Sequence, residues 1–236
     1  MFTSLIIGNG EIGNSLYNVF GGNKNSHLAM TGKVTGENKQ GQFDIIHICF
    51  PYSEEFISEV KRYQKVFEPL YTIIHSTVPV GTSRKCDAIH SPVVGVHPYL
   101  EESFKTFTKF LGGEKAGEVA DYFRRCNIKV HLEDKQETTE LLKLLCTTKY
   151  GIDIEYVKDV KRQCDKYEVP LDSWIIWNDN YNRGYQKLGQ EQFVRPNLIP
   201  IMKPIDGHCV IPNTELINTP FTKILRDLNP SQPNEN

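Results

Sequence analysis

A glycine-rich turn near the start of the chain constrains its fold more than any other feature. An apolar run over residues 3–7 leads into Gly8-Asn9-Gly10-Glu11-Ile12-Gly13, and apolar residues then recur at helical spacing up to Gly21. In such a strand, G-x-G-x-x-G and helix arrangement, Gly8 permits the turn, Gly10 lets the backbone approach a pyrophosphate, and Gly13 lets the helix pack on the strand. The helix N-terminus then faces the phosphates, so the sequence predicts a dinucleotide site.

The residue that would choose between NAD and NADP is not the usual one. An Asp or Glu that holds the ribose hydroxyls of NAD is expected about 20 residues further on, at the end of the second strand. The sequence has Met30-Thr31-Gly32-Lys33 there. Lys33 can instead meet a 2′-phosphate, so NADP stays open beside NAD. A glycine turn needed only for packing and a degraded cofactor site stay open as well.

Strands and helices alternate through the first half of the chain. Further strands are expected over 27–31, 44–50, 71–75, 93–96 and 129–132, and helices over 53–66 and 119–126. The strand at 44–50 is almost entirely apolar, which is typical of a parallel strand buried on both faces. This alternation predicts an α/β fold with a Rossmann-type, doubly wound parallel sheet.

The second part of the chain has a helical pattern. One long helix is expected from about residue 136 to 167, followed by helices near 172–188 and 213–228. We therefore expect a dinucleotide-binding Rossmann domain over 1–134, a long connecting helix with a helical substrate and dimerisation domain over 135–228, and a disordered tail over 229–236.

Composition excludes several classes of function. The 236 residues are 39% hydrophobic and 24% charged, and 27 Lys and Arg against 29 Asp and Glu give a net charge of −2, which offers no basic face to nucleic acid. No apolar run approaches the roughly 20 residues of a membrane helix, and no signal peptide precedes the first strand. The six cysteines form no C-x-x-C pair and no His/Cys cluster has metal-ligand spacing. We expect a cytoplasmic protein with reduced thiols and no metal, which binds neither nucleic acid nor membrane.

A second motif follows the strand at 71–75, where open α/β sheets bind ligands. It reads Ser76-Thr77-Val78-Pro79-Val80-Gly81-Thr82 and resembles the STVPVGT loop of the UDP-glucose/GDP-mannose dehydrogenase family. Further agreement comes from the glycine turn, Phe50-Pro51, Leu111-Gly112-Gly113, Thr139-Glu140-Leu141-Leu142-Lys143, and Gly207-His208-Cys209-Val210-Ile211-Pro212, which looks like the family's catalytic-cysteine loop. Together these motifs are far more specific than any one of them alone.

The resemblance implies a two-step oxidation of a sugar primary alcohol with NAD. The aldehyde from the first hydride transfer is trapped by a cysteine, and the second transfer gives a thioester that water cleaves. Cys209 would be the nucleophile, Lys143 a cation that stabilises the oxyanion, and Thr77 a ligand for the catalytic water. The cofactor would contact Gly8, Asn9, Gly10, Glu11, Ile12, Gly13, Pro51, Ser76 and Thr77. A small-molecule substrate, a sugar or sugar nucleotide, and a homodimer built on the long helix follow from the same resemblance.

The sequence also departs from the family pattern. Thr147, Asn213 and Val93 stand where the family has an Asn, an Asp and a Glu. Only Gly207 remains of the glycine run before the cysteine, and we expect no second Rossmann-like domain. Two other functions therefore stay open. One is a catalytically inactive nucleotide-binding or scaffold protein with this fold; the other is a single-step dehydrogenase of the 3-hydroxyacid type, which shares the layout of Rossmann and helical domains.

The candidate catalytic residues also have purely structural interpretations. Cys209 can be a small buried hydrophobic residue, and Thr77 can close a turn. Lys143 can be a solvated helix charge paired with Glu140 or Asp134. The aromatic residues of the helix at 172–188 are expected in the core or at a dimer contact: Trp174, Trp177, Tyr181 and Tyr185.

Overall fold

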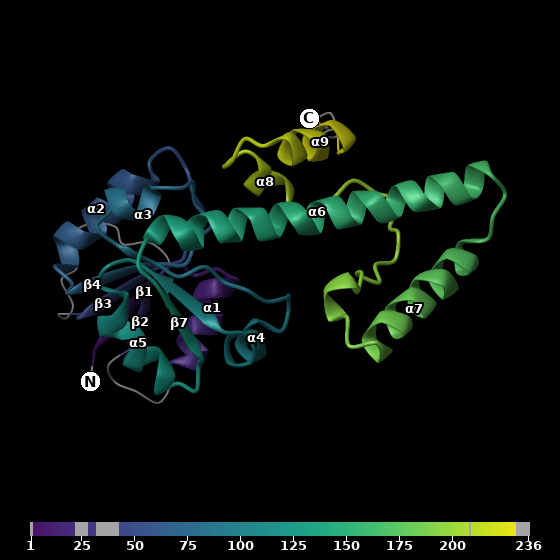
Figure 1. Cartoon of the computed structure of the whole chain (residues 1–236). Helices are drawn as coiled ribbons and strands as arrows, with labels where there is room; N and C mark the ends of the chain where they lie inside the picture. Colours follow the sequence, from purple (N-terminus) through teal and green to yellow (C-terminus); the bar gives the residue numbers. More distant parts are fainter. Residues whose placement is uncertain (1, 22–27, 32–42, 208, 230–236) are drawn as a thin grey trace. The chain divides into compact units, whose positions relative to one another are not determined.

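The computed structural model describes residues 2–21, 28–31, 43–207 and 209–229 (Figure 1). The chain divides into two compact units, Met1–Lys143 and Leu144–Asn236, and the boundary falls inside a long helix. Among the described residues, no helix has both the length and the apolar character needed to cross a membrane.

The described part of the first unit is built on a seven-stranded sheet in the order β2-β1-β3-β4-β5-β6-β7. The strands are β1 (Ser4–Ile7), β2 (Leu28–Thr31), β3 (Ile45–Ile48), β4 (Tyr71–Ile74), β5 (Ile89–His90), β6 (Lys109–Gly112) and β7 (Val130–Glu133). Neighbouring strands are parallel except β5 and β6, which are antiparallel. The chain order reverses at β1, which has β2 on one side and β3 on the other, so the carboxyl ends of β1 and β3 form the topological switch point where such sheets bind ligands.

Helices cover both faces of this sheet (Figure 1). One face carries α1 (Glu11–Val19), α4 (Leu100–Thr106) and α5 (Ala116–Arg124), and the other carries α2 (Phe56–Phe67) and α3 (Thr82–Lys85). The doubly wound fold predicted from the alternation of strands and helices is confirmed.

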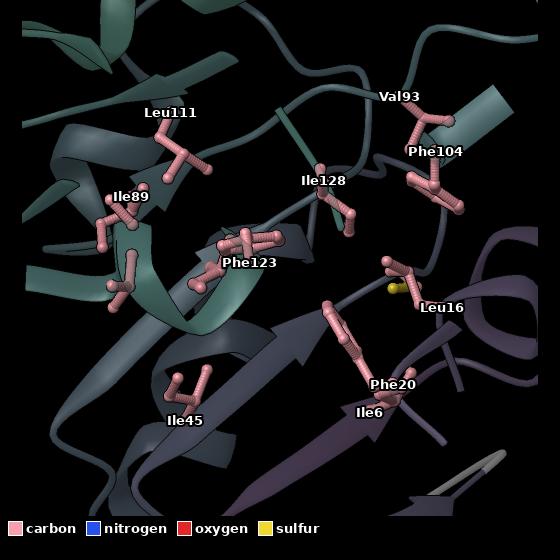
Figure 2. Packing of buried hydrophobic residues seen from close by; sticks show 14 of the residues in the cluster. Ile6, Leu16, Phe20, Ile45, Ile89, Val93, Phe104, Leu111, Phe123 and Ile128 are labelled. Atoms are coloured by element: carbon pink, nitrogen blue, oxygen red, sulfur yellow. The ribbon is translucent and has the colours of Figure 1, made fainter. Parts of the chain in front are cut away.

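Two apolar clusters hold the three layers together. Successive side chains of a strand point to opposite faces, and both faces of β1, β3 and β4 are buried. The first cluster, seen in Figure 2, includes Ile6, Ile45, Ile89, Leu16, Phe104 and Phe123. The second includes Leu5, Ile46, Ile74, Phe56, Val60 and Tyr63. Because each fully buried side chain of this size contributes about 1.5–3 kcal/mol, the sheet edges that carry the loops are fixed on a rigid core.

The second unit is helical in its described part. The long helix α6 (Gln136–Lys166) enters it from the first unit, followed by α7 (Leu171–Lys187), the 3₁₀ turn η1 (Glu191–Phe193), α8 (Ile211–Thr214) and α9 (Pro220–Leu228). Buried Asn182 of α7 donates to the carbonyl of Arg195 at 2.9 Å and accepts from its amide at 2.9 Å, so the segment after η1 is tied to α7.

Three sequence predictions need correction. The strand expected at 93–96 does not form; the carbonyl of Val93, its first residue, is bound by the side chain of Lys143 rather than by a neighbouring strand. The helix expected at 213–228 is two helices, since Thr219 and Pro220 form the N-cap and first turn of α9. Trp177, expected in the core or at a dimer contact, is 69% exposed, which excludes the core and leaves the dimer contact as a prediction.

Other elements were not predicted, or lie outside the description. Helices α3 and α4 and strands β5 and β6 are short and were not predicted from the sequence. Lys33, His208 and residues 230–236 of the expected tail lie outside the described residues.

Candidate functional site

The glycine turn after β1 has the geometry of a phosphate-binding turn. Gly8 has a φ of +125°, and a Cβ atom on it would lie 2.9 Å from the carbonyl carbon of Cys49. A Cβ atom on Gly13 would lie 1.9 Å from the carbonyl oxygen of Gly8. Gly10 is different, because a Cβ atom there would meet nothing within 4 Å. Gly8 and Gly13 thus leave no room for a side chain, whereas Gly10 lies beside open space.

The N-terminus of α1 opens at this turn. Gly10 is its N-cap and carries no side chain that could bind the first amides of the helix. The Nδ2 atom of Asn14 donates to the carbonyls of Asn9 at 3.1 Å and Gly10 at 3.0 Å, which fixes the turn from the helix side. An anion at the first turn of α1 would therefore meet amide groups and the positive end of the helix dipole.

The loops after β3 and β4 lie at the same edge as the glycine turn, because β1, β3 and β4 are successive parallel strands of the sheet. The hydroxyl of buried Ser76 donates to the carbonyl of Phe50 at 2.5 Å and ties the two loops together. Pro51 is exposed and Thr77 is half-buried. The first unit thus brings Pro51, Ser76 and Thr77 to the edge that carries the glycine turn.

The side chain of Lys143 is half-buried and bound to the loop after β5. Its ammonium group donates to the carbonyl of Val93 at 2.8 Å. One interpretation of the sequence was that Lys143 is a solvated charge on the helix. Its bond to a backbone carbonyl shows that it is not fully solvated. Val93, the residue at the family's Glu position, contributes its carbonyl here and packs its side chain in the first apolar cluster (Figure 2).

The segment that contains His97 and the start of α4 is linked to α1 by two polar contacts. His97 pairs with Glu11 in the first turn of α1. Asn18, two turns further along, donates to Glu101 of α4 at 2.5 Å. Glu11, expected among the cofactor contacts, is therefore already engaged by the segment that precedes α4.

A chain of hydrogen bonds crosses the sheet beneath these loops. Buried His47 on β3 lies 2.9 Å from buried His75 and 3.3 Å from the hydroxyl of Tyr122. His75 in turn lies 2.9 Å from the carbonyl of Ser91. A carbonyl only accepts, so Nδ1 of His75 donates to it and Nε2 accepts the proton on Nδ1 of His47. Burial lowers the pKa of His47 to about 3 and holds that of His75 well below its ordinary value, so both rings are neutral near pH 7.

A buried lysine, Lys109 on β6, completes the network. It is 4% exposed, and its ammonium group donates to the carbonyls of Ser91 at 2.8 Å and Pro92 at 2.9 Å. Burial lowers the pKa of Lys109 to about 7; the charge of Lys143 also lowers it, whereas Cys49 acts in the opposite direction. Three consecutive carbonyls, of residues 91–93, are therefore held by two lysine side chains.

The candidate nucleophile belongs to the second unit. Cys209 is exposed, and the next residue, Val210, is buried and packs at Gly151 of α6, where a Cβ atom would lie 2.7 Å from a methyl group of Val210. Asn213, at the family's Asp position, is buried in α8. Thr77 and Lys143 belong to the first unit, so the first unit alone supplies the cofactor edge and two of the three candidate catalytic residues.

Sequence analysis missed the buried polar residues that support the site. His47, His75 and Lys109 lie in or beside apolar strands, and nothing in their spacing distinguishes them from core positions. Glu140 was considered only as a partner for Lys143, but its carboxylate accepts two backbone amides, of Gly81 and Ser83. The only available signal was the polar character of these residues inside apolar runs.

Comparison with known proteins gives a likeness in fold. The chain matches no protein-family model and no curated protein sequence. Solved structures match over nearly its whole length. The UDP-D-ManNAc dehydrogenase of Pyrococcus horikoshii has a TM-score of 0.75 at 15% identity, with 96% of this chain and 68% of that chain covered. The UDP-glucose dehydrogenase of Pyrobaculum islandicum has a TM-score of 0.72 at 13% identity, with 97% and 68% covered.

A shorter dehydrogenase is also similar. The 3-hydroxyisobutyrate dehydrogenase of Mycobacterium tuberculosis has a TM-score of 0.66 at 12% identity, with 96% of this chain and 92% of that chain covered. The resemblance to sugar-nucleotide dehydrogenases noted in the sequence motifs is thus matched by the structure: this chain has the fold that the solved UDP-sugar dehydrogenases and a 3-hydroxyacid dehydrogenase share.

Proposed function

We propose that this chain is an NAD(P)-dependent oxidoreductase that oxidises a hydroxyl group of a sugar or sugar nucleotide. The glycine turn is the observation that carries the proposal. Gly8 and Gly13 leave no room for a side chain, whereas Gly10 faces open space at the N-terminus of α1. A turn needed only for packing does not require an open second glycine, whereas the close approach of a pyrophosphate does.

The bound nicotinamide would accept the hydride, and the chain's own residues would hold the substrate and manage the charge. Lys143 is positioned by the carbonyl of Val93 and would stabilise an oxyanion by its positive charge. Thr77 would hold the water that cleaves the thioester, and Cys209 would form that thioester. Full oxidation to the acid requires Cys209 to meet Lys143 and Thr77 during turnover.

Calorimetric titration of the purified chain with NAD, NADH, NADP and NADPH tests the cofactor. We expect one oxidised and reduced pair to bind and to raise the apparent Tm, because a ligand of the native state stabilises it. If none of the four binds, the oxidoreductase proposal fails and the inactive scaffold becomes the better explanation.

A single-step 3-hydroxyacid dehydrogenase is the second candidate. It is favoured by the match to 3-hydroxyisobutyrate dehydrogenase over 92% of that chain, and by Asn213, which cannot act as a base. Cys209→Ala separates the two. Loss of acid formation with unchanged cofactor affinity supports the two-step reaction, whereas turnover of a hydroxyacid that survives the substitution supports the single-step reaction.

We further propose that the enzyme is a homodimer. Large apolar side chains are exposed on α6 and α7, among them Leu142, Tyr156, Ile176 and Trp177. Exposed apolar groups of this number are typical of a surface that another chain covers. Sedimentation of the purified protein tests the dimer. The six free thiols agree with the reducing cytoplasm as its location.

A further inference from the structure

A carboxylate near the start of α6 holds one end of the loop that carries Thr77. Glu140 is completely buried. Its Oε2 atom accepts the amide of Gly81 at 2.5 Å, and Oε1 accepts the amide of Ser83 at 2.7 Å. Gly81 has a φ of +90° and is the N-cap of α3, so the carboxylate binds the amides where the loop turns into that helix.

The neighbouring residue of α6 reaches the other end of the same loop. Thr139 lies 2.8 Å from Nδ1 of buried His90, and Nε2 of that ring lies 3.2 Å from the carbonyl of Ser76. Since the carbonyl only accepts, Nε2 donates to it and Nδ1 accepts the hydroxyl proton of Thr139. Burial lowers the pKa of His90 to about 3, and the neutral ring has the one donor and one acceptor that this arrangement needs.

The loop 76–83 is therefore attached to α6 at both ends, and Thr77 lies between the attachments. Lys143 follows Glu140 by three residues on the same helix and reaches the carbonyl of Val93. The close approach of α6 depends on Gly112 of β6, where a Cβ atom would lie 2.6 Å from the hydroxyl of Thr139. One turn of α6 thus carries Lys143 and also fixes the position of the loop that contains Thr77.

We propose that Glu140 is a positioning residue, which fixes the loop of Thr77 against the helix turn that carries Lys143 and so sets the spacing of the two groups for the reaction. This inference rests on the proposed function for its catalytic consequence. The part of the inference that does not depend on that function is the attachment of the loop to Glu140. A glutamine at this position could still accept one amide, but its NH₂ group would face the other amide without an acceptor.

Hydrogen exchange and kinetics of the whole chain test the proposal with a matched pair of variants. Glu140→Gln removes one acceptor from the loop. Glu137→Gln is the control, because Glu137 lies one turn earlier on α6 and binds the exposed guanidinium of Arg84 rather than the loop backbone. We expect Glu140→Gln to speed amide exchange in residues 76–83 about tenfold and to lower kcat at least tenfold with UDP-glucose or UDP-ManNAc, while the Kd of NADH changes less than threefold.

The control variant is expected to leave exchange, kcat and Kd at wild-type values. A folded Glu140→Gln protein with wild-type exchange and kcat overturns the proposal, as does an equal loss in Glu137→Gln. If Glu140→Gln does not fold, Glu140→Asp replaces it, since it keeps the charge but shortens the reach. A wild-type chain that binds no NADH refutes the proposed function instead, and the exchange experiment then decides the attachment alone.

Discussion

The loop after β1 and the loop after β4 lie at the same edge of the sheet but are held in different ways. The turn from Gly8 to Gly13 is held by backbone packing that leaves no room for a side chain at Gly8 or at Gly13. The loop from Ser76 to Ser83 is held by buried polar side chains, His90 at its start and Glu140 at its end.

The difference predicts how each loop fails. The packing of the glycine turn does not depend on a titrating group. It is therefore disturbed by added side-chain volume and not by a change of pH. The second loop, and the residues after β5 that Lys109 holds, depend on groups whose protonation changes with pH. Volume and pH are therefore separate ways to disturb the two loops.

Acid should have the largest effect. Burial lowers the pKa of His47, His75 and His90 well below the ordinary value. All three rings therefore stay neutral in the folded chain at pH values where a free histidine is protonated. As the pH falls from about 6.5 toward 3, the unfolded chain binds protons that the folded chain does not, so stability is lost. We expect each ring to lower the free energy of unfolding by up to about 1.4 kcal/mol per pH unit, measured by urea unfolding at pH 7, 6, 5 and 4.

His90→Gln isolates one ring. The glutamine can donate to the carbonyl of Ser76 but does not titrate, so its stability should fall less steeply between pH 6 and 4, by the slope of one proton. Stability that is flat from pH 7 to 5 in the wild type would contradict the neutral rings. An equal slope in wild type and variant would show that His90 titrates normally.

A methyl group on Gly13 is the corresponding disturbance of the glycine turn. Its Cβ atom would lie 1.9 Å from the carbonyl oxygen of Gly8, so strand and helix must separate. We expect Gly13→Ala to lower the free energy of unfolding by about 3 kcal/mol at every pH from 6 to 8. The pH series distinguishes this loss from that of the histidine network, and a change below 0.5 kcal/mol would show that the turn is not tightly packed.

The two kinds of loop also differ in how far sequence could predict them. The glycine turn was predicted residue by residue, because glycine spacing and the flanking periodicities are local properties of the chain. The supports of the second loop come from β5 and α6, which are brought together only by the fold. No local pattern distinguishes a histidine that donates to a loop carbonyl from one that merely fills a strand.

The same reasoning explains the strand that was wrongly predicted at 93–96. Its apolar residues fit a strand pattern, and local propensity favours one. The carbonyls of residues 91–93 are bound by Lys109 and Lys143, whose positions in the fold are set elsewhere in the chain. Tertiary hydrogen bonding therefore overrides the local preference.

Mild alkali should raise the free energy of unfolding through Lys109, which holds the carbonyls after β5. Below pH 7 Lys109 is protonated in both states; above it the unfolded chain keeps a proton that the folded chain has lost, so stability rises toward the unfolded pKa near 10.4. We expect a gain of about 2 kcal/mol between pH 7 and 8.5, measured by urea unfolding. Lys109→Met should remove most of this slope, and a slope that persists would assign it to another group. Buried Cys49, whose pKa is raised to about 12, acts in the opposite direction only at higher pH.

The smallest effect is expected at Gly10, and it separates packing from binding within the glycine turn. Gly10 has φ −81° and ψ −174°, which alanine adopts readily, and a Cβ atom there meets nothing within 4 Å. Gly10→Ala should therefore leave the free energy of unfolding within about 0.5 kcal/mol of wild type, in contrast to Gly13→Ala. Its methyl group would stand where a pyrophosphate approaches α1, so we expect the Kd of NADH in calorimetry to rise about tenfold, which is 1.4 kcal/mol. Unchanged affinity in a stable Gly10→Ala protein would mean that the cofactor does not bind at Gly10, and the glycine turn would then serve only the packing of the core.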